Sequence, residues 1–173
     1  GLYYPEISGL PTFRKLDFYK DGRIWTNSSR YKAGMFCLDI NNTLDNNDDD
    51  KHKFVGPTFT NQDGVSEIIN DIFFFEFDKN GEMWLGTDRG IFVLREPEKF
   101  LSDDNVIFER VKIPRNDGTN LADYLLSGIY TTAICIDDAN RKWIGTQNNG
   151  VFLLSEDGKE TIYHFTEENS PLL

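Results

Sequence analysis

Three tryptophans placed at one fixed interval constrain the fold of this chain more than any other feature. They are Trp25, Trp84 and Trp143, and each lies 59 residues from the next. The segments around them superimpose on the same interval as "LDFYKDGRIWTNS", "FEFDKNGEMWLGT" and "ICIDDANRKWIGT". Self-similarity at a fixed period is typical of repeat architectures, so the chain is interpreted as three copies of one unit.

Each copy has the pattern of a short antiparallel meander. An apolar strand, such as Ile72–Phe77 in the second copy, ends at a turn that contains Gly22, Gly81 or Asn140. These residue types tolerate positive φ. The tryptophan strand follows, and a third strand then opens with "GMFCL", "GIFVL" or "GVFLL". Fourth strands are expected at Lys53–Phe59, Val106–Ile113 and Thr161–Thr166.

The strands carry apolar residues on both faces, as in "IFFFEF" and "GIFVLR", so each sheet has to be covered twice. Radially packed sheets provide this cover, and a solenoid of stacked sheets is the structural alternative. The expected fold is therefore all-β, with three four-stranded antiparallel β-propeller blades at residues 12–60, 70–113 and 130–167 of a partial propeller spanning 1–173.

Three blades do not close a ring, so the chain is expected to be a fragment of a larger propeller. Such a fragment has two uncovered apolar blade faces. We expect these faces to find partners, for example by self-association of two chains into a six-bladed ring.

Two insertions lengthen the repeats, at Asn41–His52 and at Pro114–Gly128. In the second insertion, the segment "NLADYLL" (Asn120–Leu126) predicts about two turns of helix capped by Thr119. The two cysteines, Cys37 and Cys135, each lie in an apolar run, which predicts buried free thiols.

The charge balance restricts the function classes. The formal net charge of −11 repels nucleic acid and anionic membranes, and no basic stripe offsets it, so no nucleic-acid partner is expected. The sequence contains no run of about 18 apolar residues, so no transmembrane segment is predicted. No signal peptide is recognised at the start of the sequence.

Each candidate chemical motif has a structural interpretation that fits better. The glycine-rich stretch "GEMWLGTDRG" (Gly81–Gly90) lacks the lysine of a phosphate-binding loop and leads into a strand rather than a helix. The acidic run Asp45–Asp50 offers oxygen ligands for calcium, but Lys51 competes with the metal, and a solvated loop is the preferred interpretation. His52 and His164 lie in different repeats, and His164 is expected on a strand surface.

The recurrent aspartates and tryptophans are also interpreted as structural. Asp78 and the pair Asp137-Asp138 follow first strands, where they satisfy turn backbone groups. One tryptophan per repeat predicts core packing rather than a sugar-binding platform. We therefore assign no catalytic, cofactor-binding or metal-binding residue and expect no cofactor.

The repeats resemble the two-component regulator propeller repeat, whose pattern is D-x-x-G-x-(I/L)-W-(I/L)-G-T followed by a short turn and glycine. The segments "DKNGEMWLGTDRGIFVL" (Asp78–Leu94) and "DDANRKWIGTQNNGVFLL" (Asp137–Leu154) match it, the latter with Asn140 replacing the turn glycine. The first copy departs, since Tyr19 replaces the aspartate and Asn27-Ser28 replaces Gly-Thr.

A second resemblance covers more of the chain. The run from "VKIPRNDGTNLADYLL" to "ANRKWIGTQNNGVFLLSEDGKETIYHFTEENSPLL", insertion included, is similar to PorZ-type propeller proteins of the type IX (Por) secretion system of Bacteroidetes. This resemblance implies a non-enzymatic binding or assembly module at the periplasm or outer-membrane surface. Its implied partners are proteins of a secretion and attachment complex, or a glycan.

The first resemblance implies the alternative function, a carbohydrate-sensing ectodomain of a hybrid two-component regulator. An enzyme is the third class, because propellers also carry hydrolases and lyases, but no acid–base pair is singled out at the strand ends.

Overall fold

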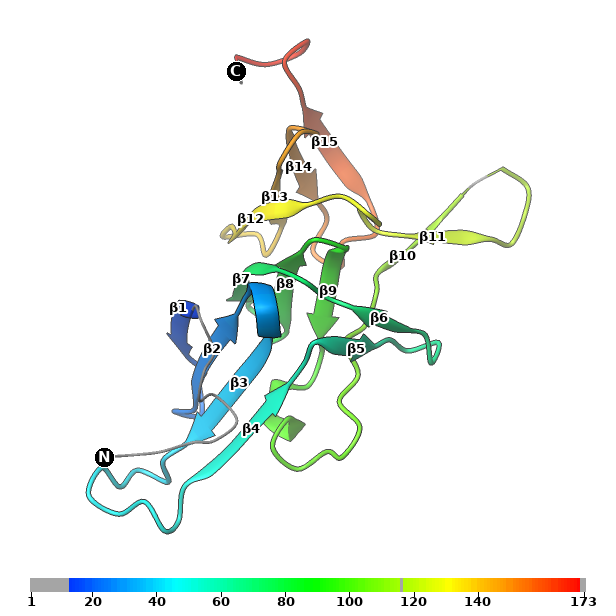
Figure 1. Ribbon diagram of the computed structural model, residues 1–173. Helices are drawn as coiled ribbons and strands as arrows, with labels where there is room; N and C mark the ends of the chain where they lie inside the picture. The colour runs from blue at the N-terminus through cyan, green and yellow to red at the C-terminus, as the bar shows by residue number, and fades with distance from the viewer. Residues whose placement is uncertain (1–12, 116, 172–173) are drawn as a thin grey trace.

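The structure, a computed structural model, describes residues 13–115 and 117–171 (Figure 1). Its regular elements are strands, apart from the short 3-10 turns η1 Arg30–Lys32 and η2 Pro97–Lys99. Three antiparallel sheets follow one another along the chain, and two short hairpins accompany them.

The three sheets are numbered in chain order. Sheet 1 contains β1 Phe13–Phe18, β2 Ile24–Ser28, β3 Gly34–Asp39 and β4 Lys51–Val55; sheet 2 contains β7 Ile72–Phe77, β8 Met83–Thr87 and β9 Gly90–Leu94; sheet 3 contains β12 Thr131–Ile136, β13 Lys142–Thr146, β14 Val151–Leu154 and β15 Thr161–Phe165. The hairpins pair β5 Thr58–Thr60 with β6 Ser66–Ile68, and β10 Lys112–Pro114 with β11 Ala122–Tyr124.

The sequence repeat produces the same strand register in all three sheets. Each tryptophan pairs with the residue eight positions before it on the first strand, as Asp17 with Trp25, Glu76 with Trp84 and Cys135 with Trp143. The first turn of each sheet has its central residue at positive φ, namely 89° at Gly22, 84° at Gly81 and 59° at Asn140. The predicted turns are therefore confirmed.

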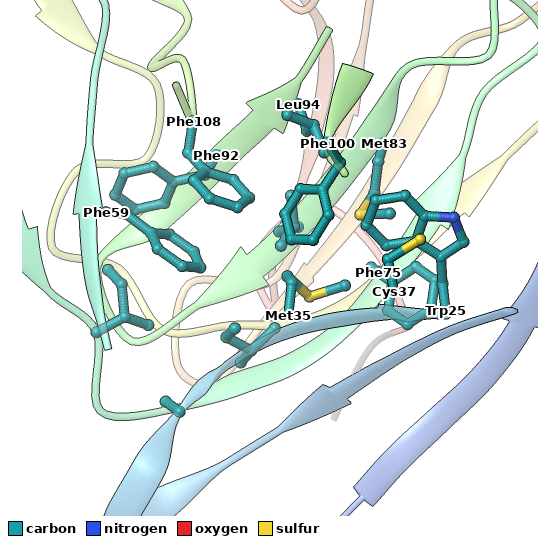
Figure 2. Close-up of a cluster of buried hydrophobic side chains, with 14 of the residues drawn as sticks. Trp25, Met35, Cys37, Phe59, Phe75, Met83, Phe92, Leu94, Phe100 and Phe108 are labelled. Atoms are coloured by element: carbon teal, nitrogen blue, oxygen red, sulfur yellow. The ribbon is translucent and has the colours of Figure 1, made fainter. Parts of the chain in front are cut away.

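Sheet 2 lies between the other two sheets and shares one apolar cluster with each (Figure 1). The first cluster joins Trp25, Met35 and Cys37 of sheet 1 to Phe75 and neighbouring residues of sheet 2, and Phe59, Phe100 and Phe108 extend it (Figure 2). The second cluster joins Trp84 to Ile134, Ile144 and Leu154 of sheet 3. These all-β sheets, each covered by its neighbour, have the architecture of propeller blades, as predicted.

The fourth strand of sheet 1 differs from the prediction of Lys53–Phe59. Strand β4 begins at Lys51 and ends at Val55, and the chain then leaves the sheet to form β5. Pro57 explains the break, because it has no backbone N–H to donate to a strand ladder. The hairpin of β5 and β6 was not predicted.

In sheet 2 the predicted fourth strand Val106–Ile113 does not form as a continuous strand. Glu109 exchanges two hydrogen bonds of 2.8 Å with Val93 of β9, so the segment takes the fourth position but forms only a bridge there. Phe108 N donates to Thr60 O of β5 at 3.0 Å, and the last two residues, Lys112 and Ile113, pair with β11 as part of β10. The ring of Phe108 also stacks on Phe59 at 3.8 Å.

The helix predicted over Asn120–Leu126 is wrong, because strand β11 lies there and pairs with β10. A segment of seven residues is too short to be a stable helix without tertiary packing, and the exposed Leu121 finds none. Thr119 therefore caps no helix. The salt bridge between Arg115 and Asp123 stabilises the hairpin instead.

Candidate functional site

Two sheet faces at opposite ends of the stack are the best candidates for binding, because no other described element covers them. We name the face of sheet 1 that bears Leu16, Phe18, Ile24, Phe36 and Leu38 the leading face. We name the face of sheet 3 that bears Cys135, Trp143, Leu153, Tyr163 and Phe165 the trailing face.

The leading face is apolar and only partly open to solvent, since Thr26 and Phe36 on it are buried. Leu16 is 63% exposed and Phe18 is 64% exposed, and both belong to β1, an edge strand of sheet 1. The face is hollowed by a groove of about 470 Å³, lined mainly by Phe13, Leu16, Ile24, Thr26, Phe36 and Leu38. Contiguous exposed apolar surface of this kind marks an interaction site in a soluble protein.

The trailing face is rich in aromatic rings. Trp143 is partly exposed and stacks on Phe165, with 5.7 Å between the ring centroids. Tyr163 is 47% exposed and lies 4.5 Å from Phe165. Cys135, which was predicted to be buried, is exposed here because its strand β12 has no neighbouring sheet on this side.

The repeat shows what normally covers each face. The residues of sheets 2 and 3 that correspond to Leu16 are Phe75 and Ile134, and both are buried against the preceding sheet. The residues that correspond to Trp143 are Trp25 and Trp84, and neither has any solvent exposure. The leading and trailing faces therefore correspond in position to the two sides of the interface between adjacent sheets.

A buried ion pair lies at the junction of sheets 2 and 3. Lys142 Nζ donates to Asp78 Oδ2 at 2.9 Å and to Asn140 O at 2.9 Å, and it also donates to Glu156 O. Both side chains of the pair are fully buried. The ammonium also lies 4.8 Å from the centre of the Trp84 ring, whose Nε1 donates to Asp78 Oδ2 at 3.2 Å.

The junction of sheets 1 and 2 has apolar residues at the same positions. Tyr19 replaces the aspartate and Met83 replaces the lysine, and both are buried. The hydroxyl of Tyr19 donates to Gly81 O at 3.1 Å, while Trp25 Nε1 has no hydrogen-bond partner among the described residues. Sheet 1 thus has Tyr19 in place of the aspartate, and sheet 2 has Met83 in place of the lysine.

On the trailing face, Asp137 is the counterpart of Asp78. Its Oδ1 accepts hydrogen bonds from the backbone N–H groups of Ala139 and Arg141, and its Oδ2 accepts from Arg141 Nε and Trp143 Nε1. Partial burial acts to raise the pKa of Asp137, but these hydrogen bonds outweigh it and lower the pKa to about 2. The negative charge of Asp137 is therefore compensated by groups of its own sheet.

This lowered pKa predicts an acid-dependent loss of stability. A carboxyl whose folded pKa is depressed contributes stability above its unfolded pKa of about 3.9, and that contribution is lost as the pH falls through the folded value. We expect the Asp137 carboxyl to titrate near pH 2 in an NMR titration. We also expect Asp137→Asn to flatten the fall of unfolding free energy between about pH 5 and pH 1. A titration midpoint near 3.9 would contradict this prediction.

The other predicted residues are placed as follows. Asp78 and Asp137 accept turn N–H groups, as predicted. Cys37 is a buried free thiol, as predicted, and burial raises its pKa. His164 lies on β15, stacks on Phe152 at 3.9 Å and contacts Asn149 O through Nε2, while His52 lies on β4 in another sheet.

The acidic run forms a loop between β3 and β4, where Asp45 and Asp48 are exposed. Asp49 accepts hydrogen bonds from Asn41 and Thr43, which hold the loop, and the first of these is the main cause of its lowered pKa. Over the described ranges, no group of three or more His, Cys, Asp or Glu side chains is arranged to hold a metal ion. The segment Gly81–Gly90 forms strand β8 with the turns on either side of it and the first residue of β9, as the strand interpretation predicts.

Two buried cations were missed from the sequence. One is Lys142, and the other is Arg110, which binds Glu67 at 2.7 Å and lies over the rings of Phe92 and Tyr124. The signal for Lys142 is its place in the repeat, where the other two copies have Ile24 and Met83. Nothing in the repeat points to Arg110.

No helix in the described part of the chain is long and apolar enough to cross a membrane. Comparison with protein-family models finds no matching family. Comparison with curated proteins finds no match either.

Comparison with solved structures finds two similar proteins. One is the extracellular domain of a hybrid two-component system from B. thetaiotaomicron, with 22% identity and a TM-score of 0.44 over 90% of this chain and 22% of that one. The other is PorZ, a bacterial surface component of the type IX secretion system of Porphyromonas gingivalis, with 31% identity and a TM-score of 0.87. That match covers 98% of this chain and 23% of PorZ. The chain is thus an all-β set of propeller blades, similar in sequence and structure to about a quarter of PorZ.

Proposed function

We propose that this chain is a non-enzymatic β-propeller module that acts in binding and assembly, outside the cytoplasm, as a PorZ-like component of type IX protein secretion. One observation carries the proposal, namely the TM-score of 0.87 to PorZ across 98% of the chain at 31% identity. The match includes the insertion between sheets 2 and 3, which is not part of the general propeller repeat. Its partners are therefore proposed to be proteins of a secretion and cargo-attachment complex.

The use of the buried polar groups supports a non-enzymatic role. Lys142 is fully engaged by Asp78, Asn140 O and Glu156 O, and Arg110 is engaged by Glu67 and by Arg89 O. An acid–base catalyst needs a titratable group that faces a substrate. These groups instead join one sheet or hairpin to the next, so their burial is explained by folding.

The apolar faces support an assembly role. Sheets 1 and 3 are each packed on sheet 2, and their other faces can therefore present a fixed surface to a partner. The leading and trailing faces each expose large apolar residues, including aromatic ones, and aromatic residues are enriched at protein interfaces. They are the proposed sites of protein contact.

The test is deletion of the encoding gene in its own bacterium, followed by measurement of type IX cargo in the periplasm and at the surface. We expect cargo to accumulate in the periplasm and surface attachment to recover when the gene is restored. Normal secretion in the deletion strain would contradict the proposal. If secretion is normal and the transcriptional response to a polysaccharide is lost, the sensor-ectodomain function replaces it.

A further inference from the structure

We infer that Asn149 is a site of spontaneous covalent modification, at which its side-chain amide becomes a carboxylate through a cyclic imide formed with Gly150. The chain contains two Asn-Gly pairs, Asn80-Gly81 and Asn149-Gly150. Asparagine before glycine is especially prone to this reaction, because glycine has no side chain to obstruct the approach of its backbone nitrogen. The fold leaves the second pair able to react and restrains the first.

The reaction is balanced with water as its only co-reactant. The backbone nitrogen of Gly150 loses its proton to solvent base and attacks Asn149 Cγ. A new N–C bond closes the imide ring, and the bond from Cγ to the side-chain nitrogen breaks, which releases ammonia. Water then opens either carbonyl of the imide and leaves aspartate or isoaspartate. The net loss of ammonia and gain of water raise the mass by about 1 Da.

The turn between β13 and β14 presents the reacting groups to solvent. Asn149 is exposed, and neither its side-chain amide nor the Gly150 N–H has a hydrogen-bond partner among the described residues. His164 Nε2 donates to Asn149 O at 2.6 Å. This hydrogen bond draws electron density from the peptide group that joins Asn149 to Gly150, and it therefore makes the attacking N–H more acidic.

The exposure of Asn149 does not depend on an uncovered sheet face. Asn149 precedes Gly150 as Arg89 precedes Gly90 in sheet 2. Sheet 2 is covered on both sides, and Arg89 is nevertheless exposed. The residue before this glycine therefore lies at the tip of a turn rather than between sheets, and such tips are accessible to chemical change.

The pair Asn80-Gly81 has the same local chemistry but is restrained. Gly81 is buried, and its N–H donates to Asp78 O at 3.0 Å. The side-chain amide of Asn80 donates to Glu156 Oε1 at 3.1 Å. Attack of the Gly81 nitrogen on Asn80 requires both hydrogen bonds to break, and each adds to the barrier. This pair is therefore an internal control for the reaction at Asn149.

The modification changes the turn and the pocket beside it. Asn149 lines this pocket together with His164, Glu167 and Glu168. A carboxylate at position 149 adds a negative charge near the two glutamates. Isoaspartate also lengthens the backbone of the turn by a carbon, so it disturbs the hydrogen bond of 3.0 Å from Thr146 N to Gly150 O. The altered form therefore differs from the original in both charge and turn geometry.

The test incubates the folded chain in mildly alkaline buffer and follows both pairs by mass spectrometry. Trypsin releases them on separate peptides, residues 80–89 and 143–159, because cleavage follows Lys79, Arg89, Lys142 and Lys159. Each modified peptide gains about 1 Da, and fragmentation locates the change and separates aspartate from isoaspartate. We expect Asn149 to react at least about tenfold faster than Asn80.

Three controls show whether the fold causes this difference. Concentrated urea removes the fold and keeps the local sequence, so both pairs should then react at similar rates. Asn149→Gln should remove the gain at this position, because glutamine has to close a larger ring. His164→Phe keeps an aromatic ring against Phe152 and removes the donor, so it should slow the reaction at Asn149 in the folded chain only.

Three results would overturn the inference: no gain at Asn149 in the folded chain, equal rates for the two pairs in the folded chain, or a faster reaction at Asn80. An unchanged rate in the His164→Phe variant would overturn the part assigned to His164. The measurement uses the isolated chain, so its outcome is independent of the proposed secretion function, which is measured by cargo location in the bacterium.

Discussion

We expect Lys142→Met to lower the free energy of unfolding by about 3–5 kcal/mol, which is a large part of the stability of a typical domain. The substitution leaves the carboxylate of Asp78 at a fully buried junction without its cation. It also removes the three hydrogen bonds of the ammonium and its contact with the Trp84 ring. Urea unfolding at one low protein concentration measures the change.

A double-mutant cycle with Asp78→Asn separates the ion pair from simple packing. Asparagine keeps the acceptor oxygen that holds the turn and removes the charge. Because the double variant contains no unpaired buried charge, its loss should fall clearly short of the sum of the two single losses. The exposed Lys159, which pairs with Asp157 at 3.6 Å, is the matched control, and Lys159→Met should change stability by no more than about 0.5 kcal/mol. Additive losses at Asp78 and Lys142 would contradict this account.

The two junctions show that the same interface is compatible with two chemistries. Asp78 of sheet 2 pairs with Lys142 of sheet 3. At the corresponding positions of the other junction, sheet 1 has Tyr19 and sheet 2 has Met83. A lysine facing Tyr19 would be buried without a carboxylate, and a methionine facing Asp78 would leave a carboxylate without a cation. Neither mixed pairing occurs at the two junctions described, so each junction is internally consistent in charge.

The strands and turns that depend on local sequence were predictable. Ile72–Phe77 was predicted residue for residue, and the fourth strand of sheet 3 was predicted to within one residue, at Thr161–Phe165. Gly22, Gly81 and Asn140 have the positive φ that their residue types suggested. In these segments the hydrophobic alternation and the turn residues favour one conformation, and the repeat supports it three times.

The segments between the repeats were not predictable in this way. The run Val106–Ile113 has the composition of a strand, but its backbone is shared between Val93 of β9 and Thr60 of β5. The outcome depends on which partners lie beside it, and a single sequence does not contain that information. The segment Asn120–Leu126 was assigned to a helix for the same reason, since its pairing partner β10 lies across an intervening loop.

The apolar residues of the candidate site were predictable from the sequence, but its polar details were not. The apolar pattern of the strands predicts apolar residues on both sheet faces, and the exposed Leu16 and Tyr163 lie on the leading and trailing faces. Lysine is rarely fully buried, so Lys142 would be placed on the surface by residue type alone. Only the alignment with Ile24 and Met83 shows that its position faces the preceding sheet.

The two tryptophans Trp84 and Trp143 should differ in their contributions to stability. Trp84 is fully buried, and Trp84→Ala is expected to lower the free energy of unfolding by about 3–5 kcal/mol, because a large cavity opens between sheets 2 and 3. Trp143 is partly exposed and stacks on Phe165, so Trp143→Ala should lower the free energy of unfolding by only about 1–2 kcal/mol. Urea unfolding at low concentration tests both values. Equal stability losses for the two variants would contradict the view that the ring of Trp143 is less completely packed than the ring of Trp84.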